Sequence, residues 1–191
     1  LRVVLMKPVS FAGEYVILCQ DKPLEAVLNE ENPGTALLEA GHAVCWVELR
    51  GMGETASISS AANWEAQVGA DWQDYFLAYL LGKSYVGMRV KDIYAVTDFL
   101  RSREERTVSL FALGQATVPA LHAAALSPER FSHTTLQGGI PSWTEVVNTP
   151  RAKQQLINAV HDALSWYDLT DLINLLPPEA VTVTNAQVSV F

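Results

Sequence analysis

Continuous apolar runs alternate with segments of helical spacing along most of the chain. Residues 15–19, Tyr-Val-Ile-Leu-Cys, are wholly apolar, as expected of a parallel strand that helices cover on both faces. Further strands are predicted at residues 1–7, 42–49, 107–113, 131–137 and 181–184, with residues 188–191 as a last strand or the second half of a short pair. Helices are predicted at residues 35–40, 85–101 and 118–126, and residues 152–176 are expected to be mostly helical. The alternation predicts an α/β fold with a doubly wound, mostly parallel sheet and helices on both faces.

Composition narrows the class of protein. The chain has 191 residues, of which 49% are hydrophobic, enough for a single domain over residues 1–191 that could belong to a longer polypeptide. The net charge of −8 is spread out, and no run of Lys or Arg indicates nucleic-acid or membrane binding. No apolar stretch reaches the roughly 18 residues of a membrane span, and the first residues indicate no compartment. Cys19 and Cys45 lie in apolar runs, which favours buried thiols over a disulfide.

Residues 109–126 predict a buried strand, a tight turn and a helix. In α/β-hydrolases such a unit carries the catalytic serine in a G-x-S-x-G elbow. Here Gly114 takes the first position, Ala116 the serine position and Val118 the last glycine position. Because an alanine cannot attack a carbonyl, the elbow of Gly114, Gln115, Ala116 and Thr117 is interpreted as degenerate.

The chain resembles the α/β-hydrolase family, and within it the acetyl xylan esterase-like branch. The likeness rests on three segments. Residues 40–55 follow the family's strand and R-G-x-G-E-T loop, and the other two segments are the helix at 85–100 and the elbow region through residue 131. The resemblance as a whole covers about residues 1–183. It implies that the strand at 15–20 lies between those at 42–49 and 107–113, that the first strand is antiparallel, and that the site lies at the carboxyl edge of the sheet.

The same resemblance implies a catalytic apparatus that the residues do not supply. The family's oxyanion loop is usually glycine-rich, but here Gln20-Asp21-Lys22-Pro23 follows the strand, and a carboxylate there would repel an oxyanion. The acid is expected after the strand at 181–184, where residues 185–187 are Asn-Ala-Gln. The catalytic histidine is expected still later, and no histidine follows His161.

Candidate ligand-binding residues follow from this placement. They are Gln20, Asp21, Gln115, Ala116, Thr117 and Trp143. No cofactor is expected, and no metal, because no two histidines have metal-ligand spacing. Trp64, Trp72 and Trp166 are also assigned to this edge, in a residual pocket or in core packing.

Several other polar residues are given structural roles. Thr117 is interpreted as a helix cap rather than a substitute nucleophile, and Asp168 with Asp171 as a cap rather than a carboxylate pair. Arg50 is expected to hold the turn at Gly51-Met52-Gly53 by bonding carbonyls or a carboxylate. His122 is expected to pack behind the elbow, His161 to lie in a helix, and His42 and His133 at the opposite edge of the sheet.

Three functions remain open. The first is a pseudoenzyme: a binding or structural domain for a small-molecule or carbohydrate-ester ligand. The second is a carboxylic-ester hydrolase that residues or a subunit outside this sequence complete. The third, a nucleotide-binding domain with phosphate at the Gly114 turn, lacks any G-x-G-x-x-G or Walker pattern. Because residues 181–191 carry no charge, this edge is expected to pair with a second copy or with a longer polypeptide.

Overall fold

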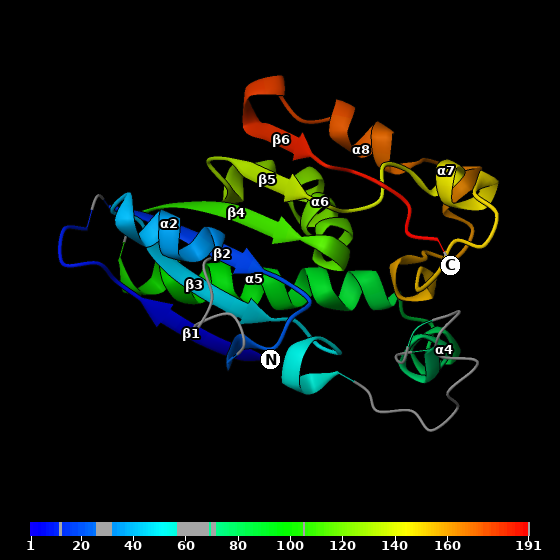
Figure 1. Ribbon diagram of the computed structural model, residues 1–191, viewed down its shortest axis with the longest axis horizontal. Helices are drawn as coiled ribbons and strands as arrows, with labels where there is room; N and C mark the ends of the chain where they lie inside the picture. The colour runs from blue at the N-terminus through cyan, green and yellow to red at the C-terminus, as the bar shows by residue number, and fades with distance from the viewer. Residues whose placement is uncertain (12, 26–31, 57–68, 70–71, 105, 191) are drawn as a thin grey trace.

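The fold is built on one six-stranded sheet. The computed structural model describes residues 1–11, 13–25, 32–56, 69, 72–104 and 106–190. Its strands are β1 (Arg2–Met6), β2 (Glu14–Cys19), β3 (Ala43–Glu48), β4 (Thr107–Leu113), β5 (Thr134–Gln137) and β6 (Val181–Thr184). Their order is β1-β3-β2-β4-β5-β6, with β1 antiparallel to β3 and every other pair parallel (Figure 1). This confirms the fold class and the strand order that the resemblance implied.

Helices cover both faces of the sheet. The α-helices are α2 (Pro33–Glu39), α4 (Trp72–Leu80), α5 (Tyr85–Arg103), α6 (Thr117–Leu126), α7 (Trp143–Asn148) and α8 (Leu169–Asn174). Short 3-10 turns are η1 (Gly53–Thr55), η2 (Gly114–Ala116), η3 (Pro128–Arg130), η4 (Leu156–Asn158), η5 (Ala163–Ser165) and η6 (Pro178–Ala180). Helix α2 lies on one face of the sheet, and α5 and α6 lie on the other (Figure 1). In the described part of the chain, no helix combines the length and apolar character of a membrane span.

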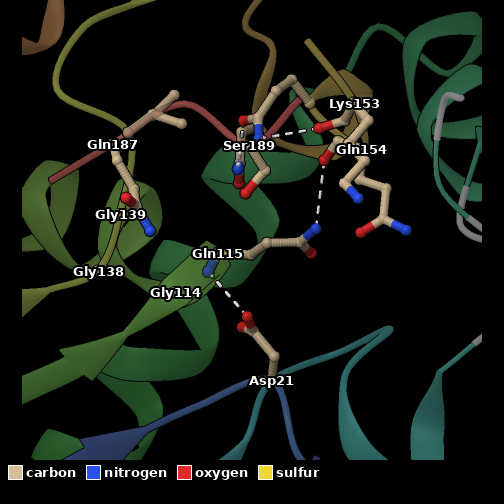
Figure 2. A pocket seen from close by; sticks show the side chains of 12 residues that line it. Asp21, Gly114, Gln115, Gly138, Gly139, Lys153, Gln154, Gln187 and Ser189 are labelled. Carbon is tan, nitrogen blue, oxygen red and sulfur yellow. Dashed lines mark hydrogen bonds between the residues drawn. The ribbon is translucent and has the colours of Figure 1, made fainter. Parts of the chain in front are cut away.

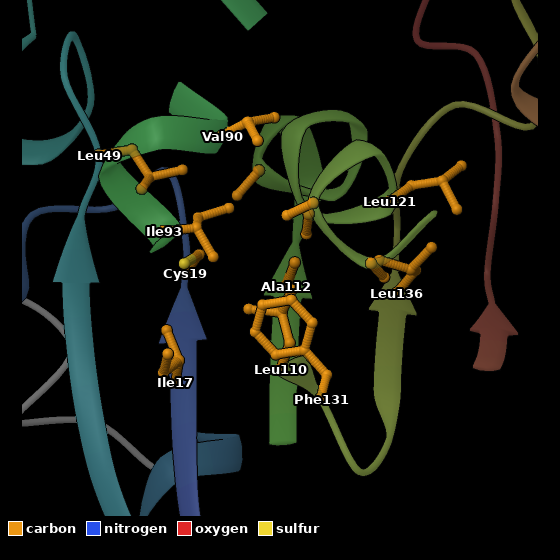
Figure 3. Close-up of a cluster of buried hydrophobic side chains, with 14 of the residues drawn as sticks. Ile17, Cys19, Leu49, Val90, Ile93, Leu110, Ala112, Leu121, Phe131 and Leu136 are labelled. Carbon is orange, nitrogen blue, oxygen red and sulfur yellow. The ribbon is translucent and has the colours of Figure 1, made fainter. Parts of the chain in front are cut away.

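The core explains the apolar runs of the sequence. Side chains alternate between the faces of a strand. On β2, therefore, Ile17 enters the large cluster beneath α5 and α6 (Figure 3), while Leu18 enters the smaller cluster beneath α2. Both side chains are 0% exposed. Cys19 and Cys45 lie on the adjacent strands β2 and β3 as buried free thiols, which confirms the sequence prediction.

The prediction of a mostly helical segment at residues 152–176 is wrong. The segment contains the turns η4 and η5 and only the short helix α8. Its backbone has positive φ at Gln154 (56°) and Asp162 (60°), and a left-handed residue interrupts α-helical hydrogen bonding. His161 therefore lies in a turn, where its ring stacks on Tyr79 with centroids 5.0 Å apart.

The end of the chain also differs from the prediction. Residues 188–190 add no strand to the sheet: Val190 forms a single antiparallel bridge with Ala152, and Ser189 accepts a hydrogen bond from the Lys153 N–H. The segment thus crosses the carboxyl edge of the strands and leaves β6 as the last strand of the sheet (Figure 1). Trp64, which the sequence analysis assigned to the carboxyl edge of the sheet, lies outside the described residues.

Candidate functional site

The sharp bend between β4 and α6 occurs at Gly114. Gly114 has a φ of 56°, a left-handed value that glycine adopts without a steric penalty. Ala116, by contrast, has helical angles (φ −71°, ψ −14°) and is 0% exposed. The prediction that Ala116 stands on the turn and faces the site is therefore wrong: Ala116 packs in the core, two residues beyond the bend.

A carboxylate occupies the space over this bend. Asp21 follows β2, the neighbour of β4, and its Oδ2 accepts a hydrogen bond from the backbone N–H of Gln115 at 3.0 Å (Figure 2). A Cβ placed on Gly114 would overlap the same oxygen atom. Asp21 thus fills the volume that any side chain at position 114 would need.

The surroundings of Asp21 affect its charge. The surrounding protein shields part of the carboxylate from water, and this desolvation raises its pKa. The backbone N–H groups of Gln115 and Ala116 and the charge of Arg89 act in the opposite direction and lower the pKa. Desolvation is the largest of these effects, so the carboxyl group is held less firmly in its charged form than a free aspartate.

A polar pocket opens beside the bend. Its volume is about 190 Å³, below the roughly 300–1,000 Å³ of pockets for drug-sized molecules. Side-chain amides dominate the lining (Figure 2), which consists of Asp21, Gly114, Gln115, Gly138, Gly139, Ile140, Lys153, Gln154, Gln155, Asn158, Gln187 and Ser189. Within this lining Asp21 is the one carboxylate, and no histidine is present.

Asn158 is the most deeply buried polar side chain of the lining. It is 2% exposed, and its Nδ2 donates to Gln155 Oε1 at 3.2 Å. Its Oδ1 has no hydrogen-bond partner among the described residues. Trp143 helps to hold the Asn158 backbone in place, because its indole Nε1 donates a hydrogen bond to the Asn158 carbonyl at 3.0 Å. A buried acceptor without a partner is costly, and this one belongs to a residue that lines the pocket.

Of the six predicted binding residues, the pocket brings together two, Asp21 and Gln115. Gln20 is buried at 6% exposure and Ala116 lies in the core. The prediction that Thr117 caps the helix is wrong: it is the first residue of α6, and its hydroxyl donates to the Gly114 carbonyl at 2.7 Å instead of accepting a helix N–H. Its side chain lines a separate apolar cavity. Trp143 also lines another cavity.

The remaining lining residues were missed by sequence reasoning. Gly138 and Gly139 follow β5 directly. A glycine pair directly after a strand could have been used to predict that these residues lie at the carboxyl edge of the sheet, beside the pocket. The segment at 153–158 was hidden because helical periodicity was assigned to it. Its non-helical path, not its composition, brings four of its residues to the pocket.

Most of the structural roles predicted for polar residues are confirmed. Arg50 Nε donates to Asp92 Oδ2 at 2.7 Å, while the fully buried Arg89 donates to the carbonyls of Arg50 (2.9 Å) and Gly51 (3.3 Å). Together these bonds hold the turn after β3.

Asp168 is a helix cap, as predicted. It forms a capping box with Asp171 at the start of α8 and also accepts the backbone N–H of Trp143 at 2.7 Å. His122 packs between Trp143 and Tyr167 behind the bend. Among the described residues, no group of three or more His, Cys, Asp or Glu side chains could hold a metal ion.

Solved structures of two esterases and of a probable hydrolytic enzyme are similar to this fold. A thermostable carboxyl esterase from Bacillus coagulans, solved with glycerol, has 17% identity and a TM-score of 0.52 over 72% of this chain and 39% of its own. A probable hydrolytic enzyme from Pseudomonas aeruginosa PAO1 has 15% identity and a TM-score of 0.48 over 78% and 41%. A cold-adapted esterase from an Arctic intertidal metagenomic library, solved with zinc, has 18% identity and a TM-score of 0.48 over 71% and 51%.

These likenesses concern the fold. The chain matches no protein-family model and no curated protein. It spans 39% to 51% of the length of the three solved structures. The sheet topology and the similarity to the Bacillus coagulans esterase establish an α/β-hydrolase-like fold.

Proposed function

Starting from this α/β-hydrolase-like fold, we propose that the chain is a non-catalytic binding domain, an esterase-like scaffold with a degenerate serine-hydrolase site. The observation that carries the proposal is the Asp21 carboxylate, bonded to the Gln115 N–H over the bend at Gly114. We assign the scaffold to the acetyl xylan esterase-like branch on the strand and loop of residues 40–55. The ligand class is a small polar molecule, such as a carbohydrate or its ester.

The position of the nucleophile supports this proposal. In a hydrolase elbow the nucleophile sits on the sharp strand-to-helix turn, flanked two residues away by small residues. The segment Ala112-Leu113-Gly114-Gln115-Ala116 has that pattern around its left-handed residue, with Ala112 and Ala116 each 0% exposed. Gly114 then stands at the nucleophile position, and glycine has no atom that can attack an ester.

The electrostatics of the bend support it too. Ester hydrolysis requires N–H donors aimed at the oxygen that becomes negative in the transition state. Here the Asp21 carboxylate accepts the Gln115 N–H, and the Ala116 N–H also lies close enough to lower the pKa of that carboxyl group. A developing oxyanion at this place would meet a negative charge rather than free donors. The site is therefore suited to holding a ligand and unsuited to hydrolysing one.

The test is esterase activity and active-site labelling. We expect no hydrolysis of p-nitrophenyl acetate above a denatured control, and no labelling by a fluorophosphonate probe. Gly114→Ser should stay inactive, because a serine without its base gains little. Asp21→Gly combined with Gly114→Ser is the matched variant in which the carboxylate no longer overlaps the new side chain. Stoichiometric labelling of a serine or threonine in the unaltered chain would refute the proposal.

A hydrolase completed by other residues is the second candidate. It is favoured by one observation, that the chain spans 39% of the length of the Bacillus coagulans carboxyl esterase structure. The nucleophile would then have to come from outside position 114. Fluorophosphonate labelling of a longer polypeptide, with no labelling within these 191 residues, would support this candidate.

A further inference from the structure

The lining of the pocket beside Gly114 includes two acceptor groups with hydrogen-bonding capacity left over, the Asp21 carboxylate and Asn158 Oδ1. From this we infer that the pocket binds an amino sugar, a small polyhydroxylated ligand that places its ammonium group against Asp21 and a hydroxyl against Asn158. The inference rests on the proposed function, because it describes what a site that binds without hydrolysis would recognise.

The protein already uses several donors of the pocket lining. The Gln115 N–H bonds Asp21, and the Gln115 Nε2 bonds the Gln154 carbonyl at 3.2 Å. The Gln155 Nε2 bonds the Lys153 carbonyl, and the Asn158 Nδ2 bonds Gln155, each at 3.2 Å.

Hydrogen-bond acceptors of Asp21 and Asn158 remain available in the same pocket lining. A carboxylate offers about four lone-pair sites, and the N–H groups of Gln115 and Ala116 occupy at most two of those on Asp21. Asn158 Oδ1, in a side chain that is 2% exposed, has no partner among the described residues. An ammonium group supplies three donors and no acceptor, which complements this set. A carboxylate or phosphate ligand would instead meet the charge of Asp21.

The size and polarity of the pocket define the rest of the ligand. A volume of about 190 Å³ suits a single sugar ring better than a drug-sized molecule. The side-chain amides around it pair with hydroxyl groups, which both donate and accept. An apolar amine of the same size would leave these amides unpaired.

Lys153 also lines the pocket and provides an internal check. Its positive charge opposes a cationic ligand, whereas it would favour an anionic one. Replacing it with methionine keeps the length of the side chain and removes the charge. Lys153→Met should therefore strengthen binding of an ammonium ligand and weaken binding of an anion.

The experiment compares three probes of one ring size: glucosamine, glucose and glucuronate. Each is titrated into the ¹⁵N-labelled protein, and the Gln115 amide resonance is followed because that N–H contacts Asp21. We expect glucosamine to bind about fivefold more tightly than glucose, the size expected of one partly exposed ion pair, and glucuronate to bind most weakly. Asp21→Asn keeps an acceptor for the Gln115 N–H and should remove the preference for glucosamine.

The outcomes separate this inference from the proposed function. Equal affinity for glucosamine and glucose, a preference for glucuronate, or no shift of the Gln115 resonance with any probe would overturn the inference. None of these results would restore hydrolysis, so the proposed function would stand. Ester turnover or fluorophosphonate labelling, in contrast, would remove the proposed function that the inference rests on. Loss of the glucosamine preference in Asp21→Asn, with a gain in Lys153→Met, would support the inference.

Discussion

A matched pair of glycine substitutions tests the arrangement at the bend. Gly114 and Gly138 both line the pocket and both have left-handed backbone, with φ of 56° and 69°. A Cβ on Gly138 would meet no atom within 4 Å, whereas one on Gly114 would overlap the Asp21 carboxylate. Alanine at the two positions therefore has the same backbone cost and differs in one contact.

The expected magnitudes follow from these two effects. An alanine in left-handed conformation costs about 1–2 kcal/mol, and this is the whole expected loss for Gly138→Ala. Gly114→Ala also pushes Asp21 away from the Gln115 N–H, and losing that 3.0 Å bond adds roughly 1–2 kcal/mol. The total for Gly114→Ala is then about 2–4 kcal/mol.

Urea denaturation followed by tryptophan fluorescence measures both variants. Asp21→Ala, alone and combined with Gly114→Ala, completes a double-mutant cycle in which we expect a coupling of about 1–2 kcal/mol. In the Asp21→Ala background the two glycine variants should lose similar free energies of unfolding. Equal losses for Gly114→Ala and Gly138→Ala in the unaltered protein would show that Asp21 does not lie over the bend, and would refute the argument for a blocked site.

Three further predictions concern other parts of the fold. Burial lowers the pKa of His122, whose Nε2 lies 3.0 Å from the Tyr167 hydroxyl, so the folded state favours the neutral ring. The contribution of His122 to the free energy of unfolding should therefore be complete above about pH 6.5 and should decrease as the pH falls below that value. Denaturation at about pH 7.5 and about pH 5.5 should show this fall, and His122→Gln should reduce it. Burial raises the pKa of Cys45 to about 12, and also that of Cys19, so a thiol reagent should label both only after unfolding; rapid labelling of the native protein would contradict their placement. We propose that the uncharged β6 edge pairs with a second copy, so Val183→Lys should lower the mass measured by light scattering, and an unchanged mass would oppose this.

The sheet was predictable from the sequence because strands that are buried on both faces appear as continuous apolar runs. The run at residues 15–19 is apolar throughout, since Ile17 and Leu18 enter different clusters. The long helix α5 was predictable for a similar reason: its buried positions, among them Val86, Val90 and Ile93, recur at helical spacing. Strand order came instead from the resemblance, because periodicity alone cannot order parallel strands.

The site was predicted less well, and local backbone conformation is the reason. The motif placed the turn at Ala116, but the strand ends at Leu113 and the left-handed residue is Gly114. The part of the pocket lining at residues 153–158 depends on a positive φ at Gln154. A glutamine in a sequence does not predict a positive φ. Asp21 was identified as an obstacle to the oxyanion, whereas its bond to Gln115 required coordinates.

The walls of the pocket come from distant parts of the chain, from Asp21 near the beginning to Ser189 near the end. No single fragment carries the site, so a ligand that fills it binds only the fully folded chain. Such a ligand must raise the free energy of unfolding by mass action, by about 2.7 kcal/mol at a concentration one hundred times its Kd. Binding of a ligand can therefore be detected through the melting temperature, and a thermal-shift screen of small polar compounds needs no assay of activity.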